Sequence, residues 1–193
     1  MNRITQLDPA AATGKSKQLF DEVQARYGVV PNILRVLANA PAALEGYLRF
    51  SDALNGGYFN ARVREQIALA VAGSNLCGYS LAAHAFFGGR AGLTAKEIVD
   101  AGHAVSDHAK TDAILKLARN VVVERGELSD AELEQAYGFG LTDGEIVETV
   151  ANVVLNILTN YVNHVARTVV DFGEAKLRGA DLNRIQDHSG ADL

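Results

Sequence analysis

The sequence predicts a single all-α domain, and three observations carry this prediction. Apolar residues recur three or four positions apart along most of the chain, as they do on the buried face of a helix. Proline, capping residues and glycine stand where such helices would begin and end. No stretch alternates apolar and polar residues as a half-buried strand does. We expect eight or nine helices and no sheet, with residues 1–172 forming the domain and residues 173–193 a polar C-terminal tail.

In the first half of the chain, proline and asparagine mark the helix starts. Proline is favoured at the first helical position and asparagine is a good N-cap. The predicted starts are Asp8-Pro9, Pro31, Pro41 and Asn60. Glycines at positions 28 and 56–57 end the first and third of these helices. A break at residues 73–75 ends the fourth, and a fifth helix is expected from about Leu76 to residues 88–89.

Three segments in the second half repeat one start signal, at residues 93–98, 128–133 and 141–146. Each has a serine or threonine followed three residues later by glutamate, which is a capping box. Each also has an apolar residue before the cap and another four residues after it, which is a hydrophobic staple. These patterns predict helix starts and carry no information about function.

Composition narrows the class of protein. The chain has 193 residues, of which 48% are hydrophobic and 21% charged, as in a globular protein with a real core. A net charge of −5 and scattered basic residues argue against a nucleic-acid or anionic-membrane partner. The longest apolar stretch, residues 150–162, contains three asparagines and is too short for a bilayer span of about 20 residues. A single cysteine and an N-terminus without an apolar leader favour a cytoplasmic setting.

No cofactor or metal motif is found in the sequence. The glycine-rich segment at residues 88–92 follows a predicted helix, whereas a phosphate-binding loop would precede one. His103 and His108 are spaced five apart and do not share a helix face, which argues against a metal site. We therefore expect no cofactor and no metal.

Four residues form the candidate site: Glu65, Cys77, Ser80 and His84. The three- and four-residue spacings place Cys77, Ser80 and His84 on one helix face, with the cysteine in the first turn, where the helix dipole favours a thiolate. Glu65 lies along a stripe of small apolar residues, where a carboxylate could serve as a proton shuttle. Each residue also has a structural interpretation: a buried cysteine, a serine near a cap, a satisfied histidine, and a glutamate paired with Arg62.

At these residues the sequence resembles the alkylhydroperoxidase D / carboxymuconolactone decarboxylase family. The family's signature is a glutamate, a step of twelve residues to Cys-x-x-Cys, and a histidine four residues after the second cysteine; the spacings from Glu65 to His84 match it. The segments at residues 30–32, 163–166 and 171–172 look like its longer, peroxidase-related branch. The resemblance covers about residues 15–172 and implies an all-α, alkylhydroperoxidase D-like helical bundle that forms a homo-oligomer, as a dimer, trimer or hexamer.

The resemblance also implies roles for the four residues. The family's peroxidases reduce hydroperoxides: the second cysteine attacks, the first resolves, and the glutamate and histidine move the proton. Glu65 and His84 match that relay, Cys77 the resolving thiol and Ser80 the attacking position. A serine hydroxyl cannot follow the oxidation steps of sulfur, so the dithiol cycle cannot run in this chain.

Four interpretations follow from this departure. The first is a peroxidase in which Cys77 attacks a hydroperoxide and an external thiol resolves it. The second is a decarboxylase-like acid–base enzyme that uses Glu65 and His84 on a carboxylated lactone, with Ser80 orienting the substrate. The third is a ligand-binding or scaffold protein without catalysis. The fourth is a natural dithiol enzyme whose second cysteine has been replaced by serine. A serine nucleophile driven by His84 ranks last, because no oxyanion-hole signature accompanies it.

Two weaker patterns complete the sequence analysis. A faint internal duplication at an offset of 80 residues aligns Glu65 and His84 with Glu145 and His164. A polar stripe with four asparagines also runs along the last predicted helix, at positions 152, 156, 160 and 163. An ordinary solvent face, a subunit interface and the wall of a site cleft all remain open for this stripe.

Overall fold

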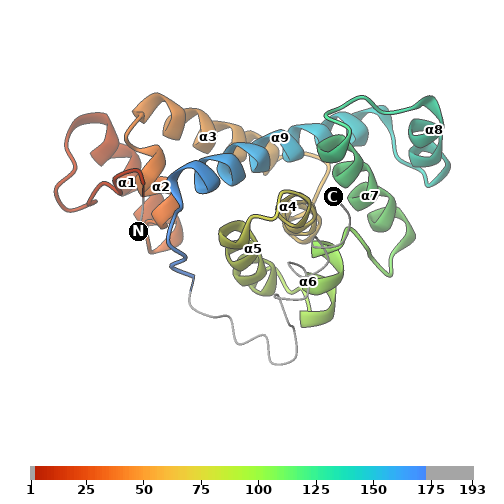
Figure 1. Ribbon diagram of the computed structural model, residues 1–193, viewed down its shortest axis with the longest axis horizontal. Helices are drawn as coiled ribbons and strands as arrows, with labels where there is room; N and C mark the ends of the chain where they lie inside the picture. The colour runs from red at the N-terminus through yellow and green to blue at the C-terminus, as the bar shows by residue number, and fades with distance from the viewer. Residues whose placement is uncertain (1–2, 173–193) are drawn as a thin grey trace.

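The computed structural model describes residues 3–172, and those residues form nine α-helices and no strand (Figure 1). The helices are α1 (Gly14–Tyr27), α2 (Asn32–Leu37), α3 (Pro41–Leu54), α4 (Ala61–Ser74), α5 (Gly78–Arg90), α6 (Ala95–Gly102), α7 (Ala109–Val123), α8 (Asp130–Gly138) and α9 (Asp143–Ala166). The all-α prediction is confirmed. The predicted tail at residues 173–193 lies outside the described residues.

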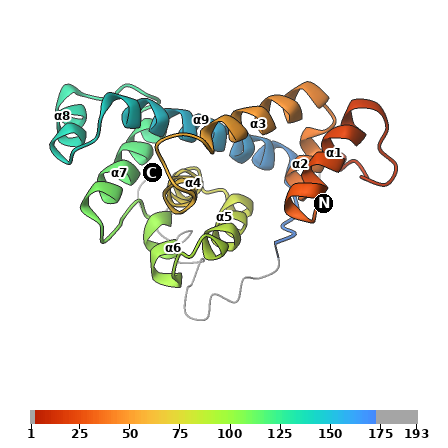
Figure 2. The ribbon, with the colours of Figure 1, turned by 180° about the vertical axis from the view of Figure 1, so that it is seen from behind.

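Helices α4 and α9 organise the fold. The 24-residue helix α9 runs along the molecule, with α1, α2 and α3 at one end and α7 and α8 at the other (Figures 1 and 2). Helix α4 lies beneath α9 and packs against α5, α6, α7 and α9, so every residue from 66 to 73 is buried. A helix segment enclosed in this way needs apolar or small residues all round, which residues 67–73 provide.

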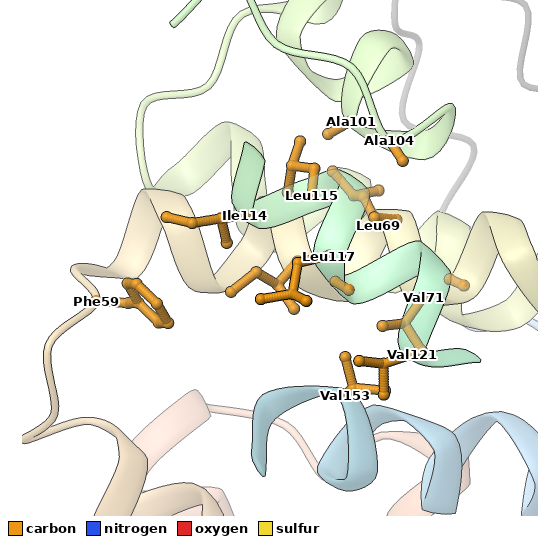
Figure 3. Close-up of a cluster of buried hydrophobic side chains, with 14 of the residues drawn as sticks. Phe59, Leu69, Val71, Ala101, Ala104, Ile114, Leu115, Leu117, Val121 and Val153 are labelled. Carbon is orange, nitrogen blue, oxygen red and sulfur yellow. The ribbon is translucent and has the colours of Figure 1, made fainter. Parts of the chain in front are cut away.

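Two hydrophobic clusters hold these layers together. The larger joins α4, α6, α7 and α9 through residues such as Leu69, Leu115 and Val153 (Figure 3). The smaller joins the N-terminal helices to α5 and includes Cys77 and Tyr79. None of the helices in the described part of the chain is long and apolar enough to cross a membrane.

Most of the predicted helix starts are confirmed. Asn60 caps α4 by accepting a hydrogen bond from the Val63 amide at 3.1 Å, and Pro41 is the first residue of α3. All three capping boxes form, at α6, α8 and α9. These capping hydrogen bonds join residues within one helical turn, so they can be predicted without knowing how the helices pack.

The predicted start at Asp8-Pro9 is wrong. Residues 9–11 form an isolated turn, in which Asp8 Oδ1 accepts from the Ala10 amide at 3.0 Å, and α1 begins only after Thr13. The physical reason is that residues 9–11 have little apolar surface to bury, whereas the residues from Ser16 onward pack into the core.

Helix α9 turns its polar stripe inward. The four asparagines are buried, while Val147, Val154, Tyr161 and Val165 on the opposite face are 52–68% exposed. The solvent-face interpretation of the stripe is therefore wrong. The faint duplication also has no counterpart at these positions, because Glu145 and His164 lie near opposite ends of the one helix α9.

Candidate functional site

A tight connection between α4 and α5 positions the cysteine. The Leu76 amide donates to Gly73 O at 3.1 Å and the Cys77 amide donates to Ala72 O at 2.9 Å, which is the hydrogen-bond pattern of a Schellman motif. Leu76 occupies the left-handed conformation, with φ of 53°, that glycine usually takes at this point. Cys77 is consequently the N-cap of α5, one residue before the first turn in which the sequence predicted it.

Glu65 and His84 meet across α4 and α5. His84 Nδ1 lies 2.8 Å from Glu65 Oε2, and the two side chains are 20% and 23% exposed. A carboxylate only accepts hydrogen bonds, so the contact assigns a proton to Nδ1, and Nε2 presents a lone pair whenever the ring is neutral. Arg62 pairs with Glu97 instead, which excludes it as the partner of Glu65.

Ser80 is tied to α9 by two amide groups. Asn160 Nδ2 donates to Ser80 Oγ at 3.0 Å and Asn163 Nδ2 donates to it at 3.3 Å. The Cys77 thiol lies 3.3 Å from Ser80 Oγ and 3.9 Å from the Asn160 backbone oxygen, and it can donate its one proton to either of these acceptors. Within residues 3–172, Ser80 Oγ makes its hydrogen bonds to α9 and Cys77 and makes none to His84, which argues against a serine nucleophile.

A cavity of about 270 Å³ opens beside these residues, between the N-terminal helices, α4, α5 and α9. Glu65, Ser80 and His84 line it, whereas the Cys77 side chain does not and is 2% exposed. Apolar side chains from α2, α3, α5 and α9 supply much of the remaining wall. Three of the four predicted site residues therefore share one cavity, and the sulfur lies behind Ser80.

Several cavity residues were not predicted as site residues. Arg64 precedes Glu65 on α4, and its guanidinium donates to the Phe59 backbone oxygen. Tyr47 also lines the cavity, and burial raises the pKa of its phenol. Asn152, Asn156 and Asn163 belong to the stripe whose role was left open, and the structure places them in the cavity wall. The signal in the sequence was the stripe's lack of charge, which is unusual for a solvent face.

The chain after α9 closes one side of the cavity. Tyr79 OH donates to Asp171 Oδ1 at 2.8 Å, and the Asn32 amide donates to Asp171 Oδ2 at 2.8 Å. Phe172 follows, packs edge-on against Tyr79 and lines the cavity. Residues 30–32 and 171–172, two of the segments that look like the peroxidase-related branch, thus meet at this side of the cavity. Burial raises the pKa of Tyr79, whose protonated hydroxyl is what this contact requires.

The loop before α4 is held by a buried carboxylate. Glu148 of α9 accepts from the amides of Tyr58 at 2.8 Å and Phe59 at 3.1 Å. A Cβ on Gly57 would lie 2.2 Å from this carboxylate, so a larger residue there would displace the carboxylate. The contact fixes the start of α4, and with it Arg64 and Glu65. No group of three potential metal ligands is found within residues 3–172.

Comparison with known proteins agrees with this fold. Residues 41–124 match the model of the carboxymuconolactone decarboxylase family. A peroxidase-related protein with an alkylhydroperoxidase AhpD core, from Ralstonia eutropha JMP134, superposes with a TM-score of 0.79 at 23% identity, over 88% of this chain and 92% of that one. A peroxidase-related protein from Silicibacter sp. TM1040 gives 0.74 at 22% identity, over 92% and 95%.

A third similar structure has a different named activity. A cysteine-to-alanine variant of the debrominase Bmp8, in complex with 2,3,4-tribromopyrrole, gives a TM-score of 0.76 at 15% identity, over 95% of this chain and 97% of that one. Identities this low establish the fold alone. No curated protein matches the chain in sequence.

The fold is all-helical and alkylhydroperoxidase D-like. Residues 41–124 match the carboxymuconolactone decarboxylase family model, in agreement with the resemblance found in the sequence.

Proposed function

We propose that the chain is an acid–base enzyme that moves a proton on a small, largely apolar substrate, with His84 taking and returning the proton. One observation carries the proposal: the hydrogen-bonded Glu65 and His84 pair opens on the cavity, whereas the cysteine sulfur lies outside its lining. Moving a proton within one substrate consumes no oxidant or reductant, so the missing second cysteine does not matter to this reaction.

Each group has a defined part in this reaction. Glu65 holds the Nδ1–H of His84, so Nε2 is the base, and the carboxylate then stabilises the imidazolium that forms. Arg64 lines the cavity next to Glu65 and has no acidic partner within residues 3–172. Its N–H groups other than the one that donates to the Phe59 backbone oxygen suit a substrate carboxylate. A carboxylated lactone fits this set: the carbon–carbon bond to the carboxylate breaks, carbon dioxide leaves, and His84, whose Nε2 has taken a proton from solvent, delivers that proton to the resulting enolate.

The test is deuterium incorporation and carbon dioxide release from a carboxylated γ-lactone in D₂O, followed by proton NMR. His84→Gln should lower the rate about 10²- to 10⁴-fold, the usual contribution of a positioned acid–base group. His103→Gln, an exposed histidine at the end of α6, is the matched control and should keep the wild-type rate. Cys77→Ala should also keep it. Full turnover by His84→Gln would overturn the proposal.

Thiol-dependent hydroperoxide reduction is the second candidate. The Cys77 sulfur is only 3.3 Å from Ser80 Oγ, which lines the cavity, and two similar structures are named peroxidase-related. The thiolate would attack ROOH to give sulfenic acid and ROH. Two external thiols would then regenerate it, releasing water and a disulfide. Cumene hydroperoxide with dithiothreitol tests this candidate: Cys77→Ala must abolish turnover, and Ser80→Cys must raise it.

A further inference from the structure

Side chains in the wall that α9 gives to the cavity donate hydrogen bonds to their own helix. Asn152 Nδ2 donates to the Glu148 backbone oxygen at 2.8 Å, and Asn156 Nδ2 donates to the Asn152 backbone oxygen at 2.8 Å. The Thr159 hydroxyl donates to the Asn156 backbone oxygen at 3.0 Å. All of these side chains except Glu148 line the cavity, and each is more than nine-tenths buried.

These contacts determine which way the amides face. A backbone carbonyl can only accept, so the nitrogens of Asn152 and Asn156 must point along the helix and their Oδ1 atoms must point away from it. Neither Oδ1 accepts a hydrogen bond within residues 3–172. The Thr159 oxygen likewise keeps its lone pairs.

Asn163 extends the same wall toward Ser80. Its nitrogen donates to Ser80 Oγ at 3.3 Å, which leaves its Oδ1 buried and without a hydrogen-bond partner among the described residues. The side chain is 4% exposed and lines the cavity. A buried acceptor without a partner is unfavourable, so a ligand that donates to it removes this cost on binding.

We infer that this acceptor wall, formed by Asn152, Asn156, Thr159 and Asn163, selects ligands that present O–H or N–H groups to α9. A ligand carboxylate would lie at Arg64, a cationic side chain in the lining of the same cavity. The apolar lining and the volume of about 270 Å³ suit one small ring between these two regions. The inference rests on the proposed function and narrows its substrate class to small carboxylated ring compounds that also carry an O–H or N–H group.

The test measures binding and not turnover. The probes are resorcinol, which carries two O–H donors on one ring, and 1,3-difluorobenzene, which has nearly the same size and no donor. Dissociation constants come from NMR titration of the full chain. Thr159→Val keeps the side-chain shape and removes the acceptor. Thr149→Val is the matched control, because Thr149 is buried on the same helix, donates to the Glu145 backbone oxygen at 2.8 Å and does not line the cavity.

Thr159→Val should weaken resorcinol binding about five- to tenfold, the size of one net hydrogen bond, and leave difluorobenzene unchanged. Thr149→Val should change neither. Asn156→Leu gives a second test and should act like Thr159→Val. Equal resorcinol affinity in the two threonine variants, or equal weakening of both probes by Thr159→Val, would overturn the inference. His84→Gln separates the two proposals: if it kept resorcinol binding and also kept turnover, only the acid–base function would fail.

Discussion

Replacing Ser80 by alanine should destabilise the fold through the amides that it leaves behind. Asn160 is fully buried, so its N–H would lose its acceptor without access to water, which costs about 1–3 kcal/mol. Asn163 lines the cavity, where its N–H can reach solvent, so losing its hydrogen bond to Ser80 costs less, about 1 kcal/mol. We expect Ser80→Ala to lower the free energy of unfolding by about 2–4 kcal/mol.

Equilibrium urea unfolding at one fixed protein concentration measures this change. Ser74→Ala is the control, because the Ser74 hydroxyl donates at 2.8 Å to the Ala70 backbone oxygen. A helical carbonyl keeps a backbone partner when such a side chain is removed, so we expect a change within about 0.5 kcal/mol. If Ser80→Ala were as stable as Ser74→Ala, the hydrogen bonds assigned to Asn160 and Asn163 would be of no energetic consequence.

Three further predictions concern packing, pH and assembly. Gly73→Ala places a Cβ 2.0 Å from the Gly102 backbone oxygen and should lower Tm sharply, whereas Gly46→Ala meets nothing within 4 Å and should not. The pKa of Glu97 is lowered, first by the backbone N–H at its own cap, so its stabilisation is present above the ordinary value of 4.5 and lost as pH falls through the folded value. Glu97→Gln should flatten the fall in Tm from pH 6 to pH 3. If the implied homo-oligomer uses the apolar outer face of α9, Val154→Glu should lower the mass measured by light scattering; an unchanged mass would contradict this.

The helices could be predicted because their signals are short-range. A capping box spans four residues, and its bonds at α6, α8 and α9 form wherever the chain enters a helix. The helix start predicted at Asp8 was wrong, because the residues that follow Asp8 have no apolar face to bury and form a turn instead. A capping signal is therefore not enough to start a helix, and the residues that follow must also bury an apolar face.

For the site too, local features could be predicted from the sequence and long-range contacts could not. The spacing of Cys77, Ser80 and His84 was enough to place them on one side of a single helix. It was not enough to show that Ser80 would bind asparagines eighty or more residues away, or that the cysteine would lie behind it. Those contacts depend on how α5 packs against α9, and no local pattern encodes that packing.

The sequence by itself determined the helical class, most of the caps and the positions of the four candidate residues, because each depends on neighbours within about one helical turn. Only the tertiary structure decided that Glu65 pairs with His84 and that the asparagine stripe of α9 faces inward. Both outcomes depend on the angle between packed helices. The Schellman turn at Leu76 joins α4 to α5, and the close approach of Gly73 to Gly102 lets α4 pack against α6.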